Sequence, residues 1–326
     1  MTTLIASNVD SKFWNIEYLA VDIIKSIERM GTVTLHFKHE GPAFVETNLH
    51  KLFRYMKDTH DVDLSKITII TGNVLEDLSQ DYNVVIKPSW MYELDEMQKI
   101  QLDTKKHSDA KTFGLLIGRC NLPRLMIAGH VFANYKEHSF LTFHYDCQND
   151  SHRNVLGLEE LIHSYGINSD IVLNSWELLK VSPIKKDSVS YPIFHPESYT
   201  GTLPWYNNFY IDIVCETYFS GNVFFPTEKT WRSLVTKTPF IVQGPRHYIR
   251  RLHKLGFKTF DRWWDESYDD DVGNYKMTSI LRVIDDIRQF KNIHEIYLEM
   301  QETLDHNYQV FKSLTTDKIQ EIICGT

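Results

Sequence analysis

Short runs of β-branched residues alternate with stretches of helical spacing in the first third of this chain. Residues 33–37 (VTLHF), 67–71 (ITIIT) and 83–87 (NVVIK) predict buried strands. Apolar positions within residues 44–56 recur at helical spacing. Because parallel strands need a crossover connection, usually a helix, this alternation predicts a parallel sheet covered on both faces. We therefore expect an α/β fold whose first lobe covers residues 1–105.

A second series of the same kind follows a polar stretch at residues 98–111. Its predicted strands are residues 112–117, 140–145, 209–214 and 239–243. Its predicted helices are residues 124–135, a segment that starts near Thr227, and residues 247–256, which end at a glycine. A chain of 326 residues without a Pro- or Ser-rich linker suits two lobes packed on each other.

The predicted architecture is therefore two Rossmann-like lobes that face a cleft. The second lobe covers residues 110–290, and C-terminal helices over residues 291–326 can cross back onto the first lobe. A hydrophobic share of 42% is ample for globular cores. Residues 146–205 combine a helical stretch with a loop rich in Pro and Ser, and their fold is left open.

The sequence predicts neither a secretory signal nor a membrane span. The N-terminal residues lack a basic run followed by an apolar core and a small-residue cleavage site. No window approaches the roughly 18 uninterrupted apolar residues of a membrane helix. The four cysteines form no C-x-x-C pair, which argues against zinc ribbons and disulfide frameworks. We expect reduced thiols and a cytoplasmic protein, in the host cytoplasm if the protein is viral.

The charge distribution favours an anionic ligand in one segment. The formal net charge of −8 gives no support to general nucleic-acid binding. Residues 191–260, however, carry eight Lys and Arg against four Asp and Glu. This excess of positive charge favours binding of an anionic ligand.

Two loops follow predicted strands, where helix N-termini offer free N–H groups and the positive end of the helix dipole. The first is residues 118–124 (GRCNLPR), and the second is residues 215–229. In the second loop, Thr227, Glu228 and Lys229 supply a hydroxyl, a carboxylate and an ammonium within one turn. A nucleotide sugar needs such groups, because cations neutralise its diphosphate and carboxylates accept hydrogen bonds from its hydroxyls. The triplet is also ordinary helix-start chemistry, so its surroundings decide between the two interpretations.

Those surroundings resemble the donor half of fucosyltransferases with the GT-B fold. The dipeptide E-T at residues 216–217 is followed after nine residues by T-E-K-T at 227–230, and then by P-F-I-V-x-G at 239–244. The loop at 118–124 resembles the S-N-x(n)-R loop that opens the donor lobe in that family. The resemblance covers residues 112–260, and similar strings occur in glycosyltransferase-like proteins of large tailed phages.

This resemblance implies a nucleotide-sugar co-substrate, UDP- or GDP-linked, and no other cofactor. Arg124, or Arg119 in its place, would meet the diphosphate together with Lys229. Glu216 and Glu228 would contact ribose or sugar hydroxyls. The implied donor-binding set is Arg119, Arg124, Glu216, Thr217, Thr227, Glu228 and Lys229. Two departures, Gly-Arg for Ser-Asn in the first loop and Glu-Thr for Glu-Asn in the second, leave the sugar and the base open.

An inverting transfer also needs a general base near the acceptor hydroxyl, usually supplied by the first lobe. Glu40 follows an early predicted strand and is the first candidate, with a solvated loop acid as the alternative interpretation. Asp146, after the strand at 140–145, is the second candidate. No metal site is expected, because the D-V-D at residues 61–63 precedes a strand and is better explained as a turn.

The leading hypothesis is a glycosyltransferase that moves a sugar from a nucleotide-sugar donor to an acceptor hydroxyl, with inversion and without a metal. The acceptor is a glycan, a small molecule or, in one alternative, a hydroxymethylated base of phage DNA that is extruded from the duplex. A second alternative is a non-catalytic nucleotide- or glycan-binding module.

Overall fold

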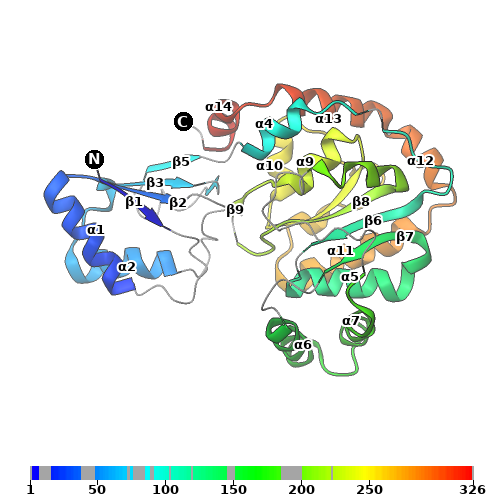
Figure 1. Ribbon diagram of the computed structural model, residues 1–326, viewed down its shortest axis with the longest axis horizontal. Coiled ribbons are helices and arrows are strands. Elements are labelled where there is room, and N and C mark those ends of the chain that lie inside the picture. Colours follow the sequence, from blue (N-terminus) through cyan, green and yellow to red (C-terminus); the bar gives the residue numbers. More distant parts are fainter. Residues whose placement is uncertain are drawn as a thin grey trace.

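The computed structural model describes residues 2–6, 16–37, 48–71, 74–75, 85–88, 92–102, 104–118, 120–144, 151–184, 200–221 and 223–324. Two four-stranded parallel sheets, each with its own hydrophobic core, form this part of the protein (Figure 1). The predicted α/β class with parallel sheets is confirmed.

The first sheet has the strand order β1-β2-β3-β5 and is parallel throughout. Its strands are β1 (Thr2–Ala6), β2 (Val33–Phe37), β3 (Ile67–Thr71) and β5 (Val85–Pro88). Its helices are α1 (Ile16–Met30), α2 (Asn48–His60) and the 3₁₀ turn η1 (Leu64–Lys66). Strands β2 and β3 lie where they were predicted, β5 begins two residues later and ends one residue later than predicted, and β1 was missed. The described core side chains include apolar residues of the two α-helices and alternate residues of β2 and β3.

The second sheet has the order β10-β8-β6-β7 and is also parallel. Its strands are β6 (Lys111–Ile117), β7 (Ser139–Phe143), β8 (Phe209–Cys215) and β10 (Phe240–Gln243). The helices that follow or cover them include α5 (Leu122–Tyr135), α9 (Glu228–Val235), α10 (Tyr248–Lys254) and α11 (Gly273–Arg288). Every residue of β8 is buried, because this strand lies inside the sheet and is covered on both faces.

The chain changes direction across this second sheet between β6 and β8. From β6 it passes through α5 to β7 on one side, and it later returns to β8 on the other side of β6. Helices after neighbouring strands therefore diverge at this point, and in open α/β sheets such a divergence opens a crevice outside the carboxyl ends of the two strands, here β6 and β8. Ligands of open α/β sheets bind at such switch points.

Most of the region that the sequence left open is helical. It contains α6 (Ser151–Tyr165), α7 (Asp170–Val181) and the 3₁₀ helix η3 (Leu203–Asn208). Helix α7 packs against α5 at Gly129, where an added Cβ would lie 2.8 Å from the backbone of Ser175. This close approach fixes the helix that begins at the crevice.

The chain enters the second core well before residue 105. Helix α4 (Tyr92–Lys99) lies in the range expected for the first lobe, yet Leu94 and Met97 belong to the second core. The Gln98 amide donates to the carbonyls of Phe311 and Leu314. The C-terminal elements are α12 (Ile293–Glu299), α13 (Gln301–Ser313), α14 (Thr316–Ile319) and the π-helical turn η5 (Gln320–Cys324). Within the described ranges, no helix combines the length and the apolar character needed to cross a membrane.

A two-stranded antiparallel sheet joins the two halves. Strand β4 (Val74–Leu75) pairs with β9 (Val223–Phe224), which lies in the long loop between β8 and α9. Val223 belongs to the first core, whereas Phe224 belongs to the second. Consecutive side chains of a strand point to opposite faces, so this one strand enters both cores.

Gly129→Ala should lower the free energy of unfolding by about 1–3 kcal/mol, because the new methyl group would overlap the backbone of α7. The loss should appear although alanine is intrinsically the better helix former by ~1 kcal/mol. Gly118→Ala is the control, since a Cβ there meets nothing within 4 Å. Urea unfolding measures both, and equal stability of the two variants would contradict the close packing of α5 on α7.

Candidate functional site

The candidate site lies at the switch point between β6 and β8. Asn121 caps α5, and its side chain accepts a hydrogen bond of 3.0 Å from the backbone N–H of Arg124. The Arg124 guanidinium is buried and its Nη2 donates to the carbonyl oxygen of Glu216 at 2.9 Å. The structure thus brings together the two loops that the sequence singled out.

The Glu216 carboxylate is the centre of the site. This side chain is 1% exposed, and it accepts four hydrogen bonds. The donors are the Thr227 N–H (3.1 Å), Thr227 Oγ1 (2.6 Å), Thr230 Oγ1 (2.6 Å) and Tyr248 Oη (3.0 Å). A buried carboxylate is stable only when donors replace its hydration, and these four do so. Its oxygens therefore hold the start of α9.

Helix α9 begins where the sequence predicted, with Thr227 as its N-cap. The Thr227 hydroxyl oxygen accepts a hydrogen bond from the Lys229 N–H at 3.3 Å and from Lys229 Nζ at 3.0 Å. Lys229 Nζ also lies 3.0 Å from Glu228 Oε1. The Lys229 side chain is 21% exposed, and its ammonium is held in place by Thr227 and Glu228.

Glu228 is ionised by its surroundings. Its Oε1 lies 3.0 Å from Arg232 Nη2 as well as from Lys229 Nζ. Burial opposes ionisation, but the two positive charges outweigh it and lower the pKa of Glu228 to about 2. Arg232 Nη1 in turn donates to Thr202 Oγ1 at 2.9 Å, which ties α9 to the segment before η3.

A second buried carboxylate lies beneath α9. Asp212 of β8 accepts hydrogen bonds from Tyr206 Oη (2.8 Å) and Ser233 Oγ (2.7 Å). Burial raises the pKa of Asp212 to about 6, against the opposing effect of these donors and of nearby cations. Burial likewise lowers the pKa of Lys106 to about 7, and its ammonium donates to the Tyr206 carbonyl and to Thr238 Oγ1.

The sequence interpretation missed several residues of this site. Tyr248 and Arg232 carry no motif of their own, and Thr230 ends the T-E-K-T string without having been assigned a role. The partners of all three became visible only in the fold. Asp212 did carry a signal, because it is the one charged residue in the otherwise apolar run FYIDIV. An acid within a buried strand needs buried donors.

The proposed base residues Glu40 and Asp146, and also Arg119, lie outside the described residues. Thr217 lies half-buried directly after Glu216. The interpretation of the D-V-D sequence as a turn is confirmed, because the Asp63 carboxylate caps η1 and accepts from the N–H and hydroxyl of Ser65.

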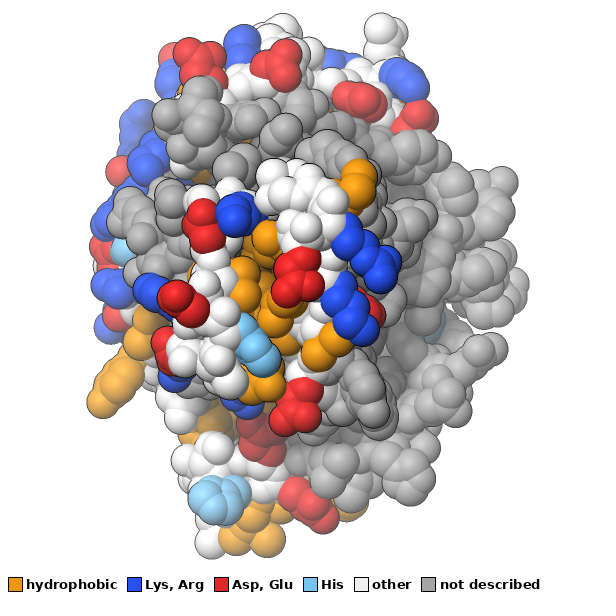
Figure 2. Space-filling model, turned by 90° about the vertical axis from the view of Figure 1, so that its left-hand side faces the viewer, with side chains coloured by type: hydrophobic (Ala, Val, Ile, Leu, Met, Phe, Trp, Pro, Cys, Tyr) orange, Lys and Arg blue, Asp and Glu red, His pale blue; other side chains and the backbone are white. Residues whose placement is uncertain are grey.

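The basic segment does not present a continuous positive face. Six of its eight cations pair with neighbouring acids or are buried: Lys229 and Arg232 with Glu228, Lys237 with Asp305, Arg250 with Asp270, Lys258 with Glu302, and Arg251 in the interior. The other two, Arg246 and Lys254, are exposed. On the end of the molecule that carries the first sheet, the described surface intersperses both signs around a strip of hydrophobic side chains (Figure 2). These contacts lend no support to binding of a DNA duplex.

The aromatic loop after residue 260 contributes to the core. The Trp264 and Tyr268 side chains are both buried, so their rings are not available to stack on a sugar or a base. The Tyr268 hydroxyl oxygen accepts from the Val242 N–H at 3.2 Å. An open groove of about 390 Å³ runs along this loop and α10, where Asp269 accepts from the N–H groups of Ile249 and Arg250.

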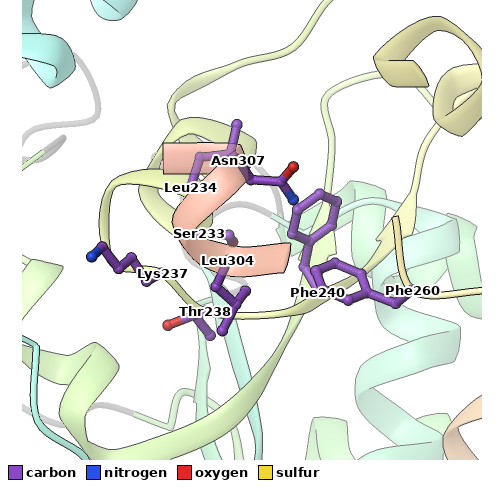
Figure 3. A pocket seen from close by; sticks show the side chains of 8 residues that line it. All are labelled: Ser233, Leu234, Lys237, Thr238, Phe240, Phe260, Leu304 and Asn307. Atoms are coloured by element: carbon purple, nitrogen blue, oxygen red, sulfur yellow. The ribbon is translucent and has the colours of Figure 1, made fainter. Parts of the chain in front are cut away.

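The other end of α9 offers no space for a ligand. The crevice behind this helix lies between α9, β10 and α13 (Figure 3). It is lined by Ser233, Leu234, Lys237, Thr238, Phe240, Phe260, Leu304 and Asn307. These side chains pack so closely that a water molecule does not fit between them.

No protein-family model and no curated protein sequence matches this chain. Among solved structures, it is similar to one described as "Crystal structure of GtfA/B complex". The alignment covers 90% of this chain and 52% of the other, with 13% identity and a TM-score of 0.35. The chain thus spans about half the length of that neighbour, and a likeness of this degree identifies neither a family nor an activity.

Asp212→Asn should flatten the pH dependence of stability between pH 4 and 6. The folded protein binds the Asp212 proton more tightly than the unfolded chain does, because the pKa is raised from 3.8 to about 6. The stability that this provides is present below pH 4 and lost as the pH rises through 6, up to about 3 kcal/mol. Urea unfolding at pH 4, 5 and 6 measures the slope, with exposed Asp305→Asn as the control. Parallel curves for Asp212→Asn and the unmodified protein would refute the raised pKa.

Gln243→Leu should raise the free energy of unfolding by roughly 1–3 kcal/mol. Gln243 is fully buried at the carboxyl end of β10, and neither polar atom of its amide has a hydrogen-bond partner. The matched control is Gln98→Leu, which removes an amide that donates to two carbonyls and should lower the stability. A loss of stability in Gln243→Leu would show that its amide is paired in solution.

Proposed function

We propose that the chain is a glycosyltransferase that binds a nucleotide-sugar donor at the crevice between β6 and β8. One observation carries this proposal: Arg124 and Lys229, each in the first turn of a helix, meet around Glu216 at the switch point of a parallel sheet. Two cations and two positive helix ends at one edge favour a ligand with more than one negative charge. A diphosphate has this character.

The motif that resembles the donor half of fucosyltransferases lies at the same edge of the sheet. The residues expected to meet the diphosphate, Arg124 and Lys229, are those that lie at the edge. The first sheet, with its own core and its connection through β4 and β9, would be the acceptor lobe of a GT-B enzyme. We propose a UDP- or GDP-linked sugar as the donor and a glycan or small-molecule hydroxyl as the acceptor.

Glu216 receives a different role from the one that the resemblance implied. Because its carboxylate is 1% exposed and accepts four hydrogen bonds inside the protein, it is not accessible to a sugar. Glu228, which stays ionised and is partly exposed, is the better partner for ribose or sugar hydroxyls. We therefore assign Glu216 to positioning and Glu228 to donor contact.

The proposed reaction is a single displacement at the anomeric carbon. The acceptor oxygen forms the new C–O bond, and the bond to the diphosphate breaks with its electron pair leaving on oxygen. The acceptor proton passes to a base, for which Glu40 is the first candidate and Asp146 the second. Lys229 and Arg124 stabilise the negative charge of the departing diphosphate, which is the task a metal ion performs in other enzymes.

Lys229→Ala should reduce transfer from a nucleotide sugar by roughly 100-fold or more, because it removes a charge that is strongest in the transition state. Release of nucleoside diphosphate from UDP- and GDP-sugars, with and without acceptor glycans, measures the reaction. Thermal stabilisation by UDP and GDP measures binding, since a ligand of the folded state raises its melting temperature.

Lys258→Ala is the control, because Lys258 is an exposed lysine paired with Glu302 away from the crevice. It should behave like the unmodified protein. Binding without any turnover in the unmodified protein would favour a non-catalytic module. Unchanged turnover in Lys229→Ala would remove the assignment of the donor site.

A further inference from the structure

Tyr248 lies where the donor crevice meets the connection to the first sheet. It is the first residue of α10, directly after the turn that follows β10, and it is fully buried. Its hydroxyl lies 3.0 Å from Glu216 Oε1 and 2.8 Å from Thr230 Oγ1. Gly244 makes room for the ring, since a Cβ there would lie 3.0 Å from it. Tyr248 thus links α10 to the first turn of α9.

The ring of Tyr248 contacts the bridging strand. Its centroid lies 5.2 Å from that of Phe224 in β9. Phe224 pairs with Val74 of β4, and its neighbour Val223 is buried in the core of the first sheet. From the same helix as Tyr248, Arg251 Nη1 donates to the Val223 carbonyl at 3.3 Å. Helix α10 therefore holds the bridging strand with one residue and the Glu216 carboxylate with another.

The loop between β8 and α9 connects the Glu216 carboxylate to the bridging strand β9. It starts at Glu216, passes through β9 and returns to Thr227, whose N–H and hydroxyl both donate to Glu216. Both ends of the loop meet at the carboxylate, and its middle pairs with β4, which follows β3 of the first sheet in the chain. A displacement of β4 must move β9, and Tyr248 is the side chain that contacts β9 and the carboxylate at once.

We propose that Tyr248 is a positioning residue that sets the geometry of the α9 N-terminus through Glu216 and couples it to the docking of the first sheet through Phe224. Its consequence for ligand binding rests on the proposed function. Burial and the charge of Glu216 raise the pKa of Tyr248, so its hydroxyl remains a donor at any working pH. Without this donor, Glu216 loses one of four partners and Lys229 loses part of its support.

Tyr248→Phe tests the role of the hydroxyl, with Tyr206→Phe as the matched control. Tyr206 is also fully buried in the second lobe, and its hydroxyl donates at 2.8 Å to the buried carboxylate of Asp212. Both substitutions remove one hydrogen bond to a buried carboxylate and should lower the melting temperature similarly. Only Tyr248→Phe should alter the first turn of α9.

Two readouts separate positioning from a merely structural role. Hydrogen exchange of the free protein should become about tenfold faster at the Thr227 and Lys229 amides in Tyr248→Phe, and should not change there in Tyr206→Phe. Isothermal titration with UDP and GDP should show about tenfold weaker binding in Tyr248→Phe alone. In turnover, the KM for the donor should rise in Tyr248→Phe and stay constant in Tyr206→Phe.

A separate substitution tests the coupling between the α9 N-terminus and the first sheet. Phe224→Leu keeps the Tyr248 hydroxyl and loosens the ring contact, and it should speed exchange at the same amides in an otherwise folded protein. It also serves if Tyr248→Phe fails to fold. Unchanged exchange at Thr227 and Lys229 in Phe224→Leu would overturn the coupling.

The outcomes for Tyr248 and for the proposed function are distinct. If the unmodified protein binds neither UDP nor GDP, the proposed function fails, and hydrogen exchange still decides whether Tyr248 positions the helix. If Tyr248→Phe and Tyr206→Phe give the same exchange at Thr227 and Lys229, the positioning role is overturned, whatever the nucleotide affinity.

Discussion

The buried carboxylate of Glu216 is the interaction on which the candidate site depends. A carboxylate removed from water requires donors in place of its hydration, and here they come from α9 and α10. The main-chain carbonyl of the same residue receives Arg124 from α5. Three helices are therefore fixed on one residue at the end of β8. Because this network closes within the protein, Arg124 and Lys229 are placed at the crevice before any ligand arrives, which is the condition for electrostatic preorganisation.

Further charged side chains interact with one another along α9. Lys229 and Arg232 share Glu228 on one side of the helix, and Asp212 lies beneath it near Arg232 and Lys106. Removing one member would leave a buried neighbour without compensation, which is far more destabilising than loss of a surface pair. This dependence gives α9 a fixed orientation on β8. Of Glu228, Lys229 and Arg232, Lys229 has the most exposed side chain, at 21%.

The sequence predicted those features of the fold that depend on contacts between residues close together in the chain. A threonine side chain can cap only residues close to it, so the start of α9 at Thr227 followed from the sequence, as did the buried strands. Glu216 is different, because Thr230 and Tyr248 lie 14 and 32 residues away. An acid that binds a sugar and an acid that holds a helix start look alike in a sequence. Likewise the apolar face of α4 predicts burial but not which core receives it, and Leu94 packs into the second.

The bridging strand β9 has only two residues, yet it contributes a side chain to both hydrophobic cores. Val223 and Phe224 are neighbours, so the pleat of β9 directs one side chain into each core. The loop that carries them begins and ends at Glu216, through the backbone on one side and through Thr227 on the other. Packing in well-filled cores resists gradual deformation, so the first sheet and the α9 N-terminus cannot move independently of this loop. If the proposed donor site is correct, its geometry responds to the position of the first sheet through this loop.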